Sequence, residues 1–218
     1  MFAKDRTKEL LTGEFAEIAP GTQGKHRIKF TEKRSLPLFL RSCYPRFLLI
    51  IMETFYYSRL ISPVAPLEIG VSDKGLMALE FDRGKFPPKS NTAVSWKESS
   101  AHTELYVREL NEYFAGGRRK FTFPLDLRGT PFQVRCWRAL LEIPYGETRT
   151  YADIARAVGC PNGYRAVGLA NNRNPIAIVV PCHRVIASDG TLCGYGGGLD
   201  VKRKLLELEG ALSGILAA

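Results

Sequence analysis

Residues 174–186 constrain the fold of this chain more than any other stretch. An apolar run, residues 176–180, is short enough to be a buried segment, and Pro181 ends it. Cys182 and His183 follow at once, so a nucleophile and a base stand side by side where the buried run stops. We therefore expect the rest of the chain to deliver a substrate to Cys182 or to support it.

A cysteine beside a histidine has two interpretations. The thiolate is the nucleophile, and His183 could take the thiol proton across a backbone bend or through a water molecule. A carboxylate behind His183 would orient it, and periodicity does not choose between Glu207 and Glu209 in the predicted last helix, residues 199–209. In the alternative, Cys182 is a buried apolar side chain and His183 a hydrogen-bonded core residue. The dipeptide alone favours that alternative.

Composition limits the class of protein. At 218 residues the chain can form one large domain or two small ones, and a hydrophobic fraction of 45% allows a packed core. The net charge of +9 favours a polyanionic partner such as nucleic acid, although over half of it lies in residues 1–51. The most apolar early stretch, residues 47–52, is too short to cross a membrane and too deep for a secretory signal.

The cysteines favour a reducing compartment. There are five, an odd number, and they form no Cys-x-x-Cys pair. None of the histidines stands at metal-ligand spacing from them. We therefore expect free thiols, a cytoplasmic protein and no metal site.

The first 125 residues carry no obvious chemistry. Residues 1–51 are basic and without period, so we expect either a disordered arm or an extension upstream of a natural start at Met52, with little packed structure. Residues 52–125 predict a scaffold domain. Three β-like segments, residues 54–60, 67–71 and 76–81, predict a small antiparallel sheet, and residues 101–114 predict a helix.

Residues 126–212 predict a second, mainly helical domain, followed by a tail at 213–218. Thr130-Pro131 begins a helix that runs to Ile143, and Thr150 caps the next, residues 151–158. A tight turn containing glycine leads to a third helix, residues 164–172, in a helix-turn-helix pattern.

The third helix has an unusual composition. Small Ala166 and Gly168 allow close approach to DNA or, equally, to a neighbouring helix. Arg165 could bind phosphate, fill a gap in a base stack, or be a solvated charge.

The sequence resembles a known family over residues 126–210. The segment Pro-Cys-His-Arg-Val-Ile, residues 181–186, is similar to the active-site motif of the O6-alkylguanine-DNA alkyltransferases. Other segments resemble the family in order and spacing: Tyr151, residues 165–168, Asn174-Pro175, the glycine-rich residues 194–198 and the helix at 202–209. The resemblance is weaker over residues 52–125 and absent over 1–51.

This resemblance implies a fold and a function. The fold would be α+β in two domains, a ribonuclease H-like sheet-plus-helix domain and a helical domain with a DNA-binding helix-turn-helix. The protein would repair double-stranded DNA, irreversibly moving methyl or other alkyl groups from O6-alkylguanine, and from O4-alkylthymine, to Cys182. The thioether product is stable, so each monomer would act once, without metal or organic cofactor.

The resemblance also implies residue roles at the reacting centre. Cys182 accepts the alkyl group, and His183, through a water molecule, and Glu209 draw off its proton. Asn174 orients the turn. Two residues donate toward the leaving guanine, Tyr151 and Lys202.

Further residues implied by the resemblance contact DNA or the base. Arg165 enters the duplex in place of the flipped nucleotide. The other DNA contacts lie on the same helix: Tyr164, Ala166, Gly168 and Asn171. A loop over the flipped base holds Tyr195, Gly196 and Gly197.

Two departures and three alternatives accompany the resemblance. Some members hold zinc in the N-terminal domain, but no matching Cys/His set exists here, and many have a polar residue where Gly196 stands.

A non-enzymatic relative that flags alkylated bases would lack Cys182. A transcription regulator would need further domains, and a cysteine hydrolase would need an oxyanion signature.

Overall fold

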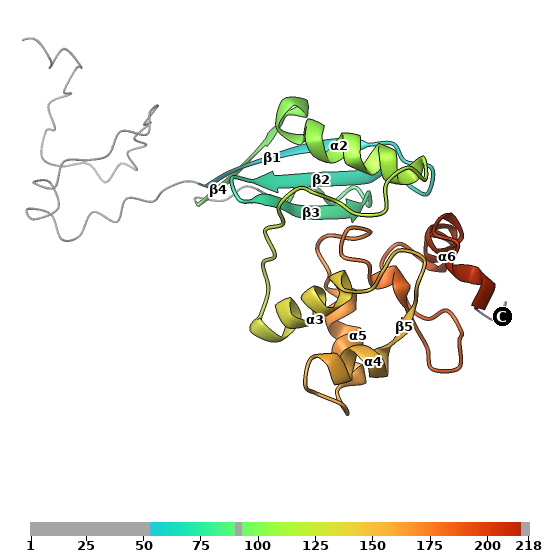
Figure 1. Cartoon of the computed structure of the whole chain (residues 1–218). Coiled ribbons are helices and arrows are strands. Elements are labelled where there is room, and N and C mark those ends of the chain that lie inside the picture. Colours follow the sequence, from blue (N-terminus) through green and yellow to red (C-terminus); the bar gives the residue numbers. More distant parts are fainter. Residues whose placement is uncertain (1–52, 90–92, 215–218) are drawn as a thin grey trace, which may run out of the picture. The chain divides into compact units, whose positions relative to one another are not determined.

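The computed structural model describes residues 53–89 and 93–214, which lie in one compact unit (Figure 1). The expectations for residues 1–51, and most of those for the tail, lie outside the described residues.

A four-stranded sheet forms the first part of this unit. Its order is β3-β2-β1-β4, with β1 (Glu53–Leu60), β2 (Leu67–Ser72), β3 (Gly75–Phe81) and β4 (Val94–Glu98). The first three strands were predicted and pair antiparallel, but β4 was missed and pairs parallel with β1. The predicted antiparallel pairing is therefore confirmed for these three strands, and the additional strand β4 makes the whole sheet mixed. After β3 the chain crosses to the opposite edge of the sheet and enters β4 in the direction of β1.

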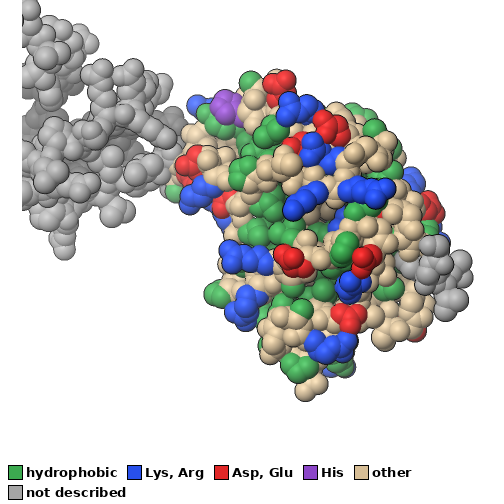
Figure 2. Space-filling view, viewed as in Figure 1, with side chains coloured by type: hydrophobic (Ala, Val, Ile, Leu, Met, Phe, Trp, Pro, Cys, Tyr) green, Lys and Arg blue, Asp and Glu red, His purple; other side chains and the backbone are tan. Residues whose placement is uncertain are grey.

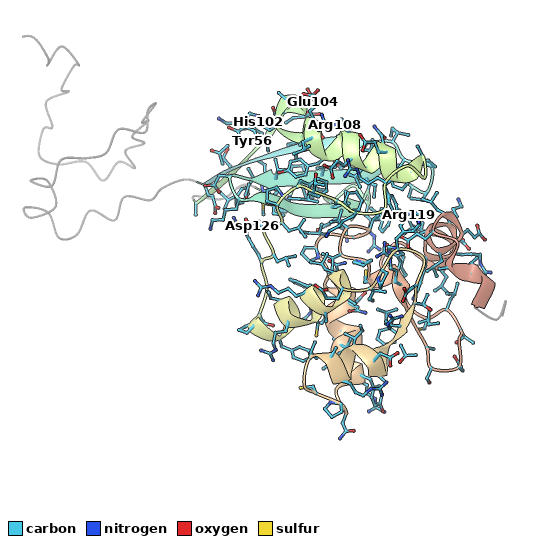
Figure 3. All side chains as sticks on the ribbon, viewed as in Figure 1. Tyr56, His102, Glu104, Arg108, Arg119 and Asp126 are labelled. Carbon is cyan, nitrogen blue, oxygen red and sulfur yellow. The ribbon has the colours of Figure 1, made fainter. Side chains whose placement is uncertain are left out.

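One face and one edge of the sheet are covered. Helix α2 (Ser100–Phe114) packs on β1 and β2, and there Tyr56 and His102 stack with ring centres 3.5 Å apart (Figures 1 and 3). On β3, the backbone of Leu79 exchanges hydrogen bonds with the C-terminal half, donating to the carbonyl of Pro175 at 2.8 Å and accepting from the N–H of Ala177 at 2.9 Å. The sheet thus holds the segment that leads to Cys182.

The predicted C-terminal helices are confirmed. They are α3 (Pro131–Leu141), α4 (Tyr151–Ala157), α5 (Tyr164–Asn172) and α6 (Leu199–Leu208). Capping boxes at Thr130 and Thr150 begin α3 and α4. The indole N–H of Trp137 on α3 donates to the carbonyl of Ala170 at 2.9 Å and so fixes the position of α5.

Three short elements surround the Cys-His motif. Strand β5 (Arg149–Thr150) pairs parallel with β6 (Val185–Ile186), which follows the 3₁₀ turn η1 (Cys182–Arg184). This pairing places the start of α4 beside the motif. A second 3₁₀ turn, η2 (Ala211–Gly214), ends the described chain.

The surface is mixed in charge. On the face that Figure 2 shows, Lys and Arg side chains lie among acidic and apolar ones rather than in a single patch. Within residues 53–89 and 93–214, no helix has the length and apolar character needed to cross a membrane. The four cysteines of these ranges are free: Cys136, Cys160, Cys182 and Cys193.

Candidate active site

The apolar run 176–180 is buried throughout, as predicted, but it folds as a tight turn. The N–H of Val179 donates to the carbonyl of Ala177 at 2.8 Å, so Ile178 is the centre of a three-residue turn. The φ of Ile178 is +70°, which β-branched residues rarely adopt. Such strain persists only where the surrounding structure fixes it, which makes this turn a rigid support for the next residues.

A second tight turn presents Cys182. Its N–H donates to the carbonyl of Val180 at 2.8 Å around Pro181, whose φ of −83° and ψ of 61° fit an inverse γ-turn. The turn η1 follows immediately, so the bend expected at Pro181 is present. Cys182 and His183 are therefore not on the opposite faces of an extended strand. Both side chains are buried.

The carboxamide of Asn174 spans this turn. Its Nδ2 donates to the carbonyl of Val180 at 2.8 Å and to the Sγ of Cys182 at 3.2 Å, while its Oδ1 accepts from the N–H of Ile176 at 3.0 Å. Burial raises the pKa of the Cys182 thiol, and the hydrogen bond from Asn174 and the charge of Lys202 oppose that rise. The thiol is therefore protonated at neutral pH.

Behind Cys182, His183 contacts a carboxylate. Its Nε2 lies 2.9 Å from the Oε1 of Glu209, the C-cap of α6, and both side chains are fully buried. Glu207 is exposed. An ionised carboxylate only accepts hydrogen bonds, so Nε2 carries the proton and Nδ1 is left as an acceptor. That Nδ1 is buried and has no partner among the described residues. Burial lowers the pKa of His183 despite the carboxylate, which keeps the ring neutral at pH 7.

Sequence reasoning missed two side-chain donors to Glu209. Arg184, inside the motif, donates from Nε to Oε2 at 2.8 Å and from Nη2 to Oε1 at 2.9 Å. Tyr113 of α2 donates from its hydroxyl to Oε1 at 2.7 Å. Burial would raise the pKa of Glu209, but the hydrogen bonds from His183 and Arg184 outweigh it and hold that pKa well below its usual range. The carboxylate is thus charged at any working pH.

Tyr151 begins α4 directly after β5, and the pairing of β5 with β6 brings it beside the motif. Burial raises the pKa of its phenol, and the neighbouring Cys193 adds to the rise. The hydroxyl keeps its proton at neutral pH and can donate it in a hydrogen bond.

Lys202 of α6 is hydrogen-bonded to the backbone of two neighbouring segments. The resemblance implied that it donates toward the leaving base. Its Nζ instead donates to the carbonyl of Val185 at 2.6 Å and to that of Cys193 at 2.8 Å, and it does not line the cavity described next. Burial lowers its pKa. The ammonium ties the loop before α6 to β6.

A cavity of about 780 Å³ opens beside Cys182. Residues expected at the site line it: Tyr151, Tyr164, Gly168, Asn171, Cys182, Tyr195 and Gly196. Arg165 and Ala166 are exposed on α5 and lie outside it. Gly197 packs against Phe81, because a Cβ at this glycine would lie 2.7 Å from the Cε2 of that ring.

Asn171, which the resemblance implies as a DNA contact, lies on the buried side of α5. Its side chain is 9% exposed, and neither its Nδ2 nor its Oδ1 has a hydrogen-bond partner among the described residues. The bond between Trp137 and Ala170 turns this part of α5 toward the core. Asn171 therefore faces inward, at the wall of the cavity. Sequence alone could not show this, because it depends on packing between α3 and α5.

The chemistry at this site rests on a thiol, an imidazole and a phenol. In the described part of the chain, no group of three or more His, Cys, Asp or Glu side chains is placed to hold a metal ion. A neutral imidazole with a free acceptor beside a hydrogen-bonded thiol can generate a thiolate when a substrate arrives.

Comparison with known proteins gives two family matches. Residues 131–211 match the model "6-O-methylguanine DNA methyltransferase, DNA binding domain". Residues 55–127 match "6-O-methylguanine DNA methyltransferase, ribonuclease-like domain". The two matches together span most of the chain.

Individual relatives are similar over nearly their whole length. A methylated-DNA–protein-cysteine methyltransferase of Methanosarcina barkeri is 50% identical over 154 residues, covering 71% of this chain and 96% of the relative. One from Mycobacterium leprae is 52% identical over 149 residues, 68% of this chain and 88% of the relative. The crystal structure of the Mycobacterium tuberculosis O6-methylguanine methyltransferase superposes with a TM-score of 0.64 at 46% identity, covering 75% of this chain and 96% of that one. A structure from the same organism in complex with DNA has a TM-score of 0.64 at 47% identity, with the same coverage.

Proposed function

The chain belongs to the methylated-DNA–protein-cysteine methyltransferase family, and from this premise we propose that Cys182 is the residue that accepts an alkyl group from O6-alkylguanine in duplex DNA. The protein repairs DNA by alkyl transfer. One observation carries the assignment to Cys182. Its thiol lines the cavity, is hydrogen-bonded by Asn174, and is followed directly by an imidazole held on a buried carboxylate.

The proton relay follows from the hydrogen bonds. Glu209 fixes the proton of His183 on Nε2, so the unpaired Nδ1 is the base. A water molecule between Nδ1 and Cys182 would carry the thiol proton to the ring. The imidazolium that forms is stabilised by the charge of Glu209. Thiolate is made only when needed, which suits a thiol whose resting pKa is raised by burial.

The transfer step balances without a cofactor. The Sγ of Cys182 attacks the alkyl carbon, a carbon–sulfur bond forms, and the bond from that carbon to O6 breaks. Guanine leaves with the electron pair, and a hydrogen bond from the Tyr151 hydroxyl to the ring stabilises it. The thioether product has no free thiol, and no further step restores one, so each molecule reacts once. Lys202 supports the step by holding the loop and by favouring the thiolate electrostatically.

The cavity takes a base that has left the duplex. An alkyl group on O6 is buried in a base pair, so the nucleotide must flip, which costs a few kcal/mol and less for a weakened pair. Exposed Arg165 would occupy the gap, with Tyr164, Ala166 and Gly168 against the minor groove. Asn171, Tyr195 and Gly196 would surround the base, and O4-alkylthymine would enter the same cavity. Every group named comes from one chain, so the monomer suffices. The cytoplasmic location stays a prediction.

Transfer of label tests the assignment. An oligonucleotide with radiolabelled O6-methylguanine is incubated with the protein, and label on the protein is counted. We expect close to one label per molecule with no turnover, and none with Cys182→Ala. Cys193→Ala, which removes the other thiol lining the cavity, should still accept label. Transfer to Cys182→Ala would refute the assignment, and repeated turnover would refute the single-use mechanism.

A further inference from the structure

A hydroxyl of the sheet-and-helix half donates a hydrogen bond to the carboxylate behind His183. Tyr113 lies on α2, and the Oη of its side chain is 2.7 Å from the Oε1 of Glu209, 96 residues later in the chain. Tyr113 is 1% exposed, and its ring packs edge-on against Tyr145 with centres 6.1 Å apart. Arg119, labelled in Figure 3, lies over that second ring at 5.6 Å. The hydroxyl is therefore fixed in place.

The oxygen that accepts from Tyr113 is the one that accepts from His183. Oε1 of Glu209 receives the Tyr113 hydroxyl, the His183 Nε2–H and the Arg184 Nη2–H. Three donors on one oxygen share its negative charge, so each bond is weaker than it would be alone. The strength of the bond to His183 decides how readily that ring becomes charged.

We propose that Tyr113 is a positioning residue of the alkyl-transfer reaction, acting through Glu209 to keep His183 neutral and ready to accept the thiol proton. The proposal rests on the function assigned above. Burial disfavours the imidazolium, whereas Glu209 favours it. By donating to Oε1, Tyr113 weakens the stabilisation of the imidazolium by Glu209. Without this hydroxyl, the carboxylate would hold the imidazolium more strongly, and the base would be occupied by a proton over a wider pH range.

Other titratable side chains surround the pair formed by His183 and Glu209. Those that face Glu209 or His183 are Tyr113 from α2, Tyr145 from the segment after α3, Cys182 and Arg184 from η1, Tyr195 from the loop before α6, and Lys202 from α6. The two cations, Arg184 and Lys202, lower the pKa of His183. Burial, together with the charge of Glu209, raises the pKa of the Tyr113 phenol. Tyr113 thus stays a donor at any pH at which the protein works.

Tyr113→Phe removes the hydroxyl and keeps the ring. The chain has three histidines, so ¹⁵N NMR of histidine-labelled protein can follow the titration of His183 directly. We expect its midpoint to move to higher pH by about half a unit, since nearby charges and hydrogen bonds shift side-chain pKa values on that scale. The acid limb of single-turnover transfer should move in the same direction, because protonated His183 cannot accept the thiol proton.

The matched control is Tyr106→Phe. Tyr106 lies two turns earlier on α2, is also buried, and packs at a tilt against Phe123, with no hydrogen bond to Glu209. It should leave the His183 midpoint in place. An unchanged midpoint in Tyr113→Phe, with a thermal unfolding curve showing a folded protein, would overturn the proposal. The NMR titration needs no reaction, so wild-type protein that fails to accept label would count against the proposed function alone.

Discussion

Two asparagines near Cys182 differ in how their amides are satisfied. Asn174 uses both ends of its carboxamide within the turn, and removing it would leave buried groups without partners. Asn171 is more deeply buried and lines the cavity, yet its two amide atoms bond to nothing among the described residues. A buried polar group without a partner destabilises the fold, so its presence here points to a ligand that supplies the missing partners.

Asn171→Leu should therefore separate stability from activity. Leucine has a similar size and removes two unpaired polar atoms, so the free energy of unfolding should rise by about 1 to 3 kcal/mol. The rate of alkyl transfer should fall, because the base loses its hydrogen-bonding partner. Urea unfolding and single-turnover transfer, measured on the same preparation, test both changes.

The control for the change in stability is Asn172→Leu, because Asn172 is exposed on α5, although it also lines the cavity. Surface substitutions usually change stability by no more than about 0.5 kcal/mol, so no comparable gain is expected. If Asn171→Leu lost stability, Asn171 would have partners in the free protein. A gain in stability with unchanged transfer would leave it without a role toward the base.

At the scale of elements, the loop before α6 is shaped from both sides. Lys202 ties its start to β6 through the carbonyls of Cys193 and Val185. On the other side, Phe81 of β3 packs edge-on against Tyr195, with ring centres 5.7 Å apart, and touches Gly197. The loop over the cavity is thus held by a helix and by the sheet.

Gly197→Ala should displace this loop. The added Cβ would lie 2.7 Å from Cε2 and 2.8 Å from Cδ2 of Phe81, so the ring or the loop must move. Overpacking of this kind costs about 1 to 3 kcal/mol, and transfer should slow as the cavity wall shifts. Thermal unfolding and transfer rates measure the two effects.

Two companion variants locate the cause. Gly196→Ala adds a Cβ where nothing lies within 4 Å, so its unfolding curve should match the wild type. Combining Gly197→Ala with Phe81→Leu should restore part of the lost stability. If the double variant is no more stable than Gly197→Ala, contact with Phe81 is not the source of the loss.

The sequence predicted local elements better than it predicted contacts. The helices with capping boxes, α3 and α4, begin where predicted and end one or two residues earlier, while Tyr164–Asn172 has both predicted bounds without a side-chain cap. The strand at Val94–Glu98 was missed although Val94 and Trp96 alternate with polar residues, because the segment is only five residues long. Tyr113 could not be assigned, since its partner is 96 residues away. The motif identified Cys182 and His183, while the inward side of Asn171 depends on how α5 packs.

At the scale of the molecule, the two predicted domains share one core. Buried residues of the sheet, such as Leu79, and of the helical half, such as Ile176, belong to a single apolar cluster. The backbone of β3 is also hydrogen-bonded to the segment that leads to Cys182. Because neither half buries its apolar surface alone, the described residues should unfold as one cooperative unit.

The two tryptophans allow the cooperativity of unfolding to be measured. Trp96 lies on β4 of the sheet and Trp137 on α3 of the helical half, and the chain has no other tryptophan. In Trp137→Phe the fluorescence reports on the sheet, and in Trp96→Phe it reports on the helical half. Within each variant, the urea midpoint from fluorescence should coincide with the midpoint from far-UV circular dichroism, which follows both halves at once. Comparing the two probes within one variant removes the effect of the substitution on stability. Separate midpoints in either variant would mean that the halves unfold independently, and the hydrogen bond from Tyr113 to Glu209 would then be lost as soon as either half unfolds.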